Sequence, residues 1–232
     1  GKKLSKRDGA MDVMDYKNQG YLPEALLNFL VRLGWSNGDQ EIFSMEDMLE
    51  LFDPSNINKS ASAYNAEKLL WLNSEYIKAV SNDRLIEELK FFDLDLSHHP
   101  KRTELLDLAK QRAQTILELK KSVTDIIDIP NSYDEAGVKK FVKEDTKDFL
   151  EKYLILLEQN KENLYDVSKI EEITKPFINE NGLKFPQLFQ PIRIALTGGT
   201  QAPSVYDIIS ILGFIEVSSR LNKALKRNFQ NT

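Results

Sequence analysis

The chain has 232 residues, of which 41% are hydrophobic and 29% charged, and its formal net charge at pH 7 is -5. It contains no cysteine, which excludes disulfides and thiolate metal sites. No apolar run approaches the roughly 18 residues of a membrane span. No apolar stretch follows the basic N-terminus, as a secretory signal would require. This composition is typical of a cytoplasmic protein.

The first half of the chain predicts helices separated by loops. Residues 1–10 are polar, contain two glycines and predict a loop. Proline at position 23 suits a first helical turn, and Gly34 suits a helix end. Ser44 is expected to cap a short helix that Asp53 and Pro54 end. The expected helices span about 22–34, 44–52, 65–80, 83–90 and 100–119.

The second half continues the helical pattern after a break. Residues 128–137 contain Pro130, Asn131, Ser132 and Gly137, so we expect a boundary there. Helices are expected at about 138–158, 168–179, 189–196, 203–212 and 214–227. No segment alternates β-branched and polar residues as a strand would. The sequence therefore predicts an all-α protein of two or three small helical units.

Charge is distributed unevenly along the chain. Residues 1–7 carry four positive charges and no negative one, and residues 184–232 carry six positive against two negative. Residues 134–180 carry twelve negative against eight positive. The two basic ends are compatible with a nucleic-acid face. They are equally compatible with the ordinary charge clusters of solvated helices.

The segment Lys3-Leu4-Ser5-Lys6-Arg7 packs three cations and a hydroxyl into five residues. Such a loop suits phosphate, because ammonium groups can follow the charge that develops on a phosphoryl group in transfer. Taken alone, a basic run near a terminus is more often a solvated tail. The sequences that follow decide between these interpretations.

Three blocks of sequence resemble the bacterial glutamyl-tRNA synthetases, which are class I aminoacyl-tRNA synthetases. The first joins the Lys-Leu-Ser-Lys-Arg loop to Gly20-Tyr21-Leu22-Pro23-Glu24-Ala25-Leu26-Leu27-Asn28 and Leu33-Gly34-Trp35. The second is Lys68-Leu69-Leu70-Trp71-Leu72-Asn73, and the third runs from Leu188 to Gly198, followed by Ala202-Pro203. The blocks occur in the order of the family and span nearly the whole chain.

The resemblance implies a phosphate-binding role for the lysine loop. In the family, the second lysine of this signature stabilises the transition state of adenylate formation, a catalytic role that falls on Lys6. Lys3, Ser5 and Arg7 would complete the ATP-binding loop, with Mg²⁺ as the metal in the full-length enzyme. The His-Ile-Gly-His signature of the class is absent, since His98 and His99 are adjacent. The chain alone is therefore expected neither to catalyse aminoacylation nor to bind a cofactor.

The resemblance also implies anticodon binding near the C-terminus. In the family, an arginine and the turn after the Ala-Leu-Thr-Gly string contact unstacked anticodon bases, whose edges and faces are open to protein groups. These positions are Arg193, Thr200, Ala202, Pro203 and Val205. Arg193 could instead form a structural ion pair. Many relatives carry Gly or Thr at position 202, so the contact there is expected to differ. Arg112 is a candidate reader of the third anticodon base, without a secure register.

The implied organisation has three parts. Residues 1–80 would hold the lysine loop and a stem-contact connector, and residues 81–137 and 138–232 would form a two-domain anticodon-binding cage. The expected partner is tRNA(Glu), tRNA(Gln) or both, bound by a monomer away from membranes, with glutamate and ATP as substrates of the full-length enzyme. The chain opens inside a loop, so we expect it to be part of a longer protein. The alternatives are a non-catalytic helical RNA-binding module and a scaffold that binds no RNA.

Other residues carry weaker signals. Glu24 is expected to stabilise the positive end of a helix rather than act as a base. Trp71, between two leucines, is expected in the core rather than as a base-stacking platform. Residues 197–200 lack the Gly-Lys-Ser/Thr of a phosphate-binding loop. His98 and His99 have no third ligand at useful spacing, so no metal site is expected.

Overall fold

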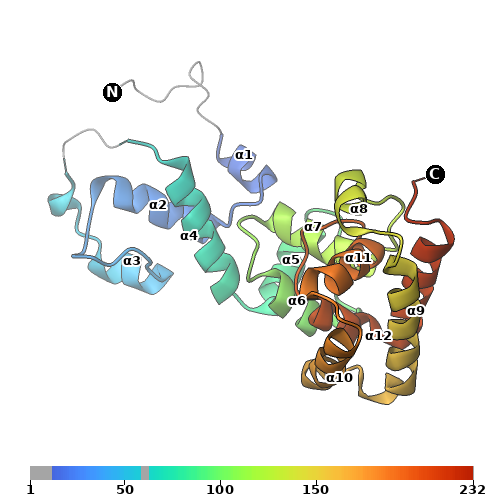
Figure 1. Ribbon diagram of the computed structural model, residues 1–232. Coiled ribbons are helices and arrows are strands. Elements are labelled where there is room, and N and C mark those ends of the chain that lie inside the picture. Colours follow the sequence, from blue (N-terminus) through green and yellow to red (C-terminus); the bar gives the residue numbers. More distant parts are fainter. Residues whose placement is uncertain (1–11, 59–62, 232) are drawn as a thin grey trace. The chain divides into compact units, whose positions relative to one another are not determined.

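The computed structural model describes residues 12–58 and 63–231, and within them every regular element is a helix (Figure 1). This confirms the all-α prediction. The chain forms two compact units, residues 1–121 and 122–232, and the boundary falls within one helix. The three-part division expected from the sequence stays a prediction.

Unit 1 contains α1 and the helices that follow it as far as the first half of α7. The bounds are α1 Val13–Asn18, α2 Pro23–Gly34, α3 Met45–Leu51, α4 Ala66–Ala79, α5 Asn82–Lys90, α6 Arg102–Ala109 and α7 Ile116–Ile127, with a short 3-10 turn at Pro54–Asn56. Helix α2 packs against α4 through Leu26, Phe29, Leu69 and Leu72. A second cluster joins Trp35, Phe43 and Met48.

Several local signals of unit 1 are confirmed. The hydroxyl of Ser44 accepts a hydrogen bond of 2.9 Å from the Asp47 amide, and the Asp47 carboxylate accepts one of 2.9 Å from the Ser44 amide. This reciprocal capping box starts α3. Pro23 occupies the first turn of α2, where its missing N–H costs nothing. Glu24, in the same turn, lies 3.7 Å from the guanidinium of Arg84.

Two expectations for unit 1 were wrong, and one helix was not predicted. The helix without a prediction is α1, which Asp12 caps with its own capping box. The single helix expected at 100–119 is two helices, and Arg112 lies exposed in the turn between them. Trp71 is 40% exposed instead of buried in the core. Its position between two leucines suggested burial, but Trp71 lies off the buried face of α4, which consists of Leu69, Leu72, Asn73, Ser74 and Ile77.

Unit 2 is built around α11. Its helices are α8 Glu135–Phe141, α9 Thr146–Gln159, α10 Val167–Glu180, α11 Phe185–Thr197 and α12 Val205–Lys226, with a 3-10 turn at Lys161–Asn163. Helix α11 packs against α8, α9 and α12 (Figure 1). Its buried face includes Leu188, Ile192, Ala195 and Leu196.

The helix boundaries of unit 2 match the expectations in part. The expected break between two C-terminal helices is present, since Gly213 has φ 72° and ψ 171° and kinks α12. The expected helix at 138–158 is divided into α8 and α9. Helix α11 starts at Phe185, earlier than expected, because Pro186 sits in its first turn and Pro191 is tolerated inside it.

Candidate nucleic-acid interface

The lysine loop lies outside the described residues, so Lys3, Ser5, Lys6 and Arg7 have no described geometry. The segment that contains Gly20 and Leu22, later in the chain, is hydrogen-bonded to the side chain of Asn73 on α4. The amide of Leu22 donates to the buried side-chain oxygen of Asn73 at 2.8 Å. The Asn73 nitrogen donates to the carbonyls of Gly20 at 3.3 Å and Gln114 at 2.6 Å. Asn73 therefore joins the α1–α2 turn to the α6–α7 loop.

Gly20 is required at this turn. Its φ is +84°, and a Cβ there would lie 2.8 Å from the backbone nitrogen of Ile116. That nitrogen donates to the Gly20 carbonyl at 2.9 Å, so the first turn of α7 is satisfied by a distant part of unit 1. The turn therefore depends on two features of Gly20: its carbonyl, which accepts this hydrogen bond, and its lack of a side chain, which would otherwise clash with Ile116.

The turn of residues 198–204, between α11 and α12, is held on three sides. Gly198 ends α11 in the left-handed conformation, with φ +80°, and a Cβ there would lie 2.8 Å from the Ser132 carbonyl. The Asp134 amide donates to the Gly198 carbonyl at 2.7 Å. The Thr200 hydroxyl donates to the Asp134 carboxylate at 3.3 Å. Arg193 donates from Nη2 to the Pro203 carbonyl at 3.3 Å.

These contacts bring together the site residues that the sequence predicted. Arg193, Thr200, Ala202, Pro203 and Val205 share one turn and its flanking helix ends. Ala202 and Val205 are only 8% and 2% exposed, and Pro203 is also buried. These three residues therefore shape the turn and offer little surface to a ligand.

Two exposed side chains of the turn were missed as individual site residues. Gln201 and Ser204 are exposed while their neighbours are buried. The signal was available, because Gln201 and Ser204 are the polar residues of the segment Gln201-Ala202-Pro203-Ser204-Val205. These two side chains present an amide and a hydroxyl, which can hydrogen-bond the edge of an unstacked base.

Two buried polar atoms lie on the helices beside the turn. The side-chain oxygen of Gln190 and the hydroxyl of Tyr206 have no hydrogen-bond partner among the described residues. Gln190 is one turn before Arg193 on α11, and Tyr206 is in the first turn of α12. Burial raises the pKa of Tyr206, and the negative charge of Glu171 adds to the rise. The tyrosine is thus held as a neutral hydroxyl that can donate.

The sequence did not predict Arg220 as a site residue, although it stabilises the end of α11, where the turn begins. It is 1% exposed and donates from Nη1 to the carbonyls of Leu196, at 2.7 Å, and Ile126, at 2.9 Å. Nη2 donates to the Ile127 carbonyl at 3.0 Å, and Nε to the Glu216 carboxylate at 2.7 Å. The end of α11 and the end of α7 are therefore joined by one guanidinium. No sequence pattern distinguishes Arg220 from an exposed helix arginine.

The described residues were also compared with the requirements of a metal site and of a membrane-spanning helix. Across the described residues, no group of three or more His, Cys, Asp or Glu side chains is arranged to hold a metal ion. His98 and His99 lie in a loop, where His99 Nδ1 accepts a hydrogen bond of 3.1 Å from the Lys101 amide. None of the helices in the described part of the chain has the length and apolarity of a membrane span.

Comparison with known proteins gives two family matches. A model described as the anticodon binding domain matches residues 58–225. A model described as the catalytic domain of class I tRNA synthetases (E and Q) matches residues 1–71. The first match covers the turn of residues 198–204 and Arg220.

Individual relatives agree with these models. The chain is 84% identical over its full 232 residues to "Glutamate--tRNA ligase 1" of Aliarcobacter butzleri (strain RM4018), of which it covers 50%. It is 49% identical over 226 residues to "Glutamate--tRNA ligase 2" of Campylobacter curvus (strain 525.92), covering 97% of the chain and 48% of the relative.

Among solved structures, a glutamate tRNA ligase from Elizabethkingia meningosepticum CCUG26117 is similar with a TM-score of 0.84 and 28% identity, over 97% of this chain and 49% of that one. The chain thus spans about half the length of the relatives it matches. With the turn and the two family models in agreement, the chain belongs to the glutamate–tRNA ligase family, whose other name is glutamyl-tRNA synthetase.

Proposed function

We propose that the chain is the tRNA-binding part of a glutamate–tRNA ligase and that the turn of residues 198–204 reads the anticodon. The observation that carries the proposal is the way this turn is fixed, with Gly198, Thr200 and Pro203 each held by a contact from another segment. A turn held in this way presents Gln201 and Ser204 to bases at little further loss of entropy on binding.

The proposed site assigns two kinds of contact. Arg193 lies beside the turn and supplies a permanent positive charge that can approach a base edge or a phosphate. Thr200, Ala202, Pro203 and Val205 set the shape of the turn. Gln201 and Ser204 add the exposed side chains that discriminate between bases.

The whole protein is proposed to join L-glutamate to tRNA(Glu), to tRNA(Gln), or to both. ATP and Mg²⁺ would activate glutamate as the adenylate, with Lys6 stabilising the transition state and Lys3, Ser5 and Arg7 around the phosphates. The match of residues 1–71 to the catalytic-domain model supports a contribution of this chain to that site. Because the chain spans about half of its relatives, we expect no aminoacylation by the chain alone.

The organisation proposed for this function follows the family. Residues 1–80 would contact the inner side of the tRNA, and residues 81–137 and 138–232 would enclose the anticodon loop. The protein is proposed to act as a cytoplasmic monomer. A helical scaffold that binds no RNA is the rival function, and the net charge of -5 is the property that favours it.

Binding of the 232-residue chain to unmodified tRNA(Glu) and tRNA(Gln), titrated at several salt concentrations, tests the proposal. We expect affinity to fall with salt, because each neutralised phosphate releases counterions. Arg193→Ala and Gln201→Ala are each expected to weaken binding of the cognate tRNA roughly 10- to 100-fold, the range of one lost base contact. Lys175→Ala is the control, since Lys175 is paired with Glu171 at 2.7 Å on α10.

Each result has a consequence. The tRNA that binds more tightly identifies the substrate. Equal weakening of both tRNAs by Arg193→Ala would move Arg193 from base recognition to phosphate binding. Absence of binding to either tRNA at low salt would favour the scaffold.

A further inference from the structure

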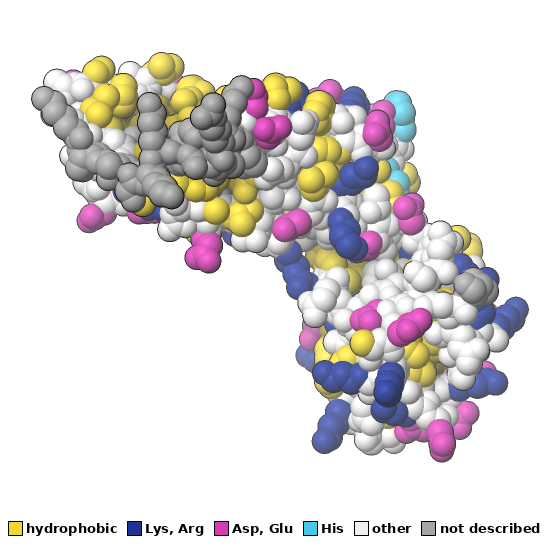
Figure 2. Space-filling view, turned by 90° about the horizontal axis from the view of Figure 1, so that it is seen from above, with side chains coloured by type: hydrophobic (Ala, Val, Ile, Leu, Met, Phe, Trp, Pro, Cys, Tyr) yellow, Lys and Arg dark blue, Asp and Glu magenta, His cyan; other side chains and the backbone are white. Residues whose placement is uncertain are grey.

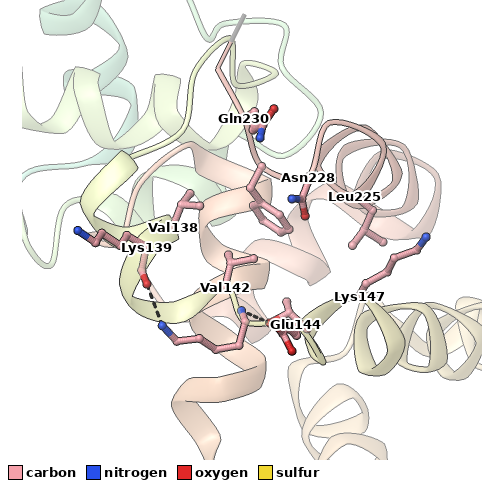
Figure 3. Close-up of a pocket in the computed structure, with 11 residues that line it drawn as sticks. Val138, Lys139, Val142, Glu144, Lys147, Leu225, Asn228 and Gln230 are labelled. Atoms are coloured by element: carbon pink, nitrogen blue, oxygen red, sulfur yellow. Dashed lines mark hydrogen bonds between the residues drawn. The ribbon is translucent and has the colours of Figure 1, made fainter.

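A second pocket in unit 2 lies outside the turn of residues 198–204. It has a volume of about 580 Å³ and is formed by α8, the loop to α9, the start of α9, and the end of α12 with the chain that follows it (Figure 3). That volume is within the roughly 300–1,000 Å³ typical of ligand sites. Its lining residues are Val138, Lys139, Val142, Lys143, Glu144, Thr146, Lys147, Leu225, Asn228, Phe229 and Gln230.

The charge of this pocket is opposite in sign to that of the chain. Three lysines and one glutamate line it, in a protein whose net charge is -5. Lys139 makes no ion pair with any described carboxylate, and the Lys147 ammonium is 3.8 Å from Glu151. Lys143 donates to the Lys139 carbonyl at 2.8 Å. The positive charge is therefore only partly neutralised.

In two other pockets, the positive charge of the lining side chains is neutralised by ion pairs. In one, Lys169 is paired with Glu172 at 2.9 Å. In the other, Glu41 accepts from Lys68 at 2.9 Å and from Arg32 at 3.5 Å. Their cations are already satisfied. Figure 2 shows basic side chains around much of the face of unit 2 that is turned to the viewer.

The floor of the lysine-lined pocket is apolar and its rim is polar. In Figure 3, Val138, Val142 and Leu225 point toward the middle, while Lys139 and Lys147 stand on opposite sides. Phe229 is 3% exposed and packs on Tyr133, with ring centroids 5.8 Å apart. Asn228 and Phe229 have φ of 48° and 57°, so the chain reverses there and leaves the amides of Asn228 and Gln230 exposed at the rim.

Helix α8 joins this pocket to the turn of residues 198–204. A Cβ on Gly137 would lie 2.5 Å from the Thr200 methyl group, so the start of α8 is in close contact with the turn. Val138 and Lys139 of this short helix, and Val142 directly after it, line the pocket. A strand of RNA that leaves the turn can therefore continue along α8.

We infer that this pocket binds the ribose-phosphate backbone of the tRNA beside the anticodon. Ammonium groups match phosphates, the valine and leucine side chains match the apolar face of a ribose, and the two amides can bond its 2′-hydroxyl. Such contacts position RNA without reading sequence. This inference rests on the proposed function and adds a second contact to it.

The test replaces two lysines and leaves the third. Lys143 is bonded to the end of α8, so the variant is Lys139→Gln with Lys147→Gln. The control is Lys169→Gln with Lys175→Gln, which removes the same charge from α10, where both lysines are ion-paired. Circular dichroism establishes that both variants keep the helix content of the original chain. Affinity for tRNA(Glu) and tRNA(Gln) is then measured across a salt series.

We expect the pocket variant to bind tRNA about tenfold more weakly than the control. The slope of log affinity against log salt should become shallower by roughly one to two, about one for each phosphate contact removed. The loss should be equal for both tRNAs, whereas Arg193→Ala changes their ratio. If the pocket variant behaves as the control does while Arg193→Ala still weakens binding, the inference is overturned and the proposed function stands. If the original chain binds neither tRNA, both are overturned.

Discussion

The guanidinium of Arg220 donates a 2.7 Å hydrogen bond to the carbonyl of Leu196, one residue before the end of α11. The last carbonyls of a helix have no partner within the helix, and here a buried cation supplies one. The same guanidinium reaches two carbonyls at the end of α7. The start of the turn of residues 198–204 is therefore fixed by a residue that a ligand cannot touch.

Replacing Arg220 should destabilise unit 2. Arg220→Ala leaves the carbonyls of Leu196, Ile126 and Ile127 without their donor, and the first two of these bonds are buried. We expect a loss of roughly 2–4 kcal/mol, at about 1–3 kcal/mol for each buried carbonyl that stays unsatisfied. Arg220→Lys should recover only part, because one ammonium cannot reach the same acceptors. Urea unfolding followed by circular dichroism measures this. Lys226→Ala, an exposed neighbour on α12, should change the free energy by less than about 0.5 kcal/mol.

Gly198 and Gly182 form a matched pair. Both have positive φ, but a Cβ on Gly182 meets nothing within 4 Å, whereas one on Gly198 lies 2.8 Å from a carbonyl oxygen. Gly182→Ala should cost only the left-handed conformation, about 1–2 kcal/mol. Gly198→Ala should cost clearly more and weaken tRNA binding. Equal urea midpoints for the two variants would show that the turn moves away from Ser132 without cost.

Asn73 should be the most sensitive polar residue of unit 1. Asn73→Ala leaves the Leu22 amide and the carbonyls of Gly20 and Gln114 without this partner, at about 1–3 kcal/mol for each buried group that stays unsatisfied. Both tryptophans of the chain are in unit 1, and Trp35 is 5% exposed, so tryptophan fluorescence follows its unfolding in urea. Asn65→Ala, which removes only the cap of α4, should cost about 1 kcal/mol. A smaller effect at Asn73 than at Asn65 would contradict the bridging role.

Tyr76 should make unit 1 less stable at high pH. Burial raises the pKa of Tyr76 to about 12, from an ordinary value near 10, while its hydroxyl bonds the Phe43 carbonyl and, at 2.9 Å, the Asn28 oxygen. Because the folded pKa is above the unfolded one, its contribution is complete below pH 10 and is lost as pH rises through 12. The urea midpoint measured by tryptophan fluorescence should fall as pH rises from about 8 to about 11.5. In Tyr76→Phe, the decrease of the midpoint with pH should be smaller. An unchanged slope in that variant would assign the loss to other tyrosines.

Local signals predicted most helices of unit 1. Proline at the start of α2, the Ser44 capping box and the apolar spacing of α4 each involve residues within a few positions of one another, so the sequence contains the whole interaction. The break between α6 and α7 had a similar signal that was overlooked. Thr115 accepts from the Glu118 amide at 3.2 Å, as an N-cap residue does, and Glu118 accepts from the Gln114 amide at 2.8 Å. Regular apolar spacing across the break concealed it.

The sequence predicted where the candidate interface lies along the chain but not which of its residues are exposed. Resemblance to the family pointed to Arg193 and the turn after Gly198, and their role in binding stays a prediction. It could not separate the buried Ala202, Pro203 and Val205 from the exposed Gln201 and Ser204, because burial depends on which helices cover the turn. It also gave no indication of the pocket between α8 and the end of α12.

The sequence by itself determined the all-helical class and the family, since these follow from short-range periodicity and continuous sequence blocks. Only the tertiary structure decided that Arg220 supports Leu196, that Ser132 excludes a side chain at Gly198, and that Asn73 joins Gly20 to Gln114. In each of these contacts the partners are between 24 and 66 residues apart, or farther in the bonds to α7. Chain folding brings such partners together, and no local pattern records the distance or direction of that approach.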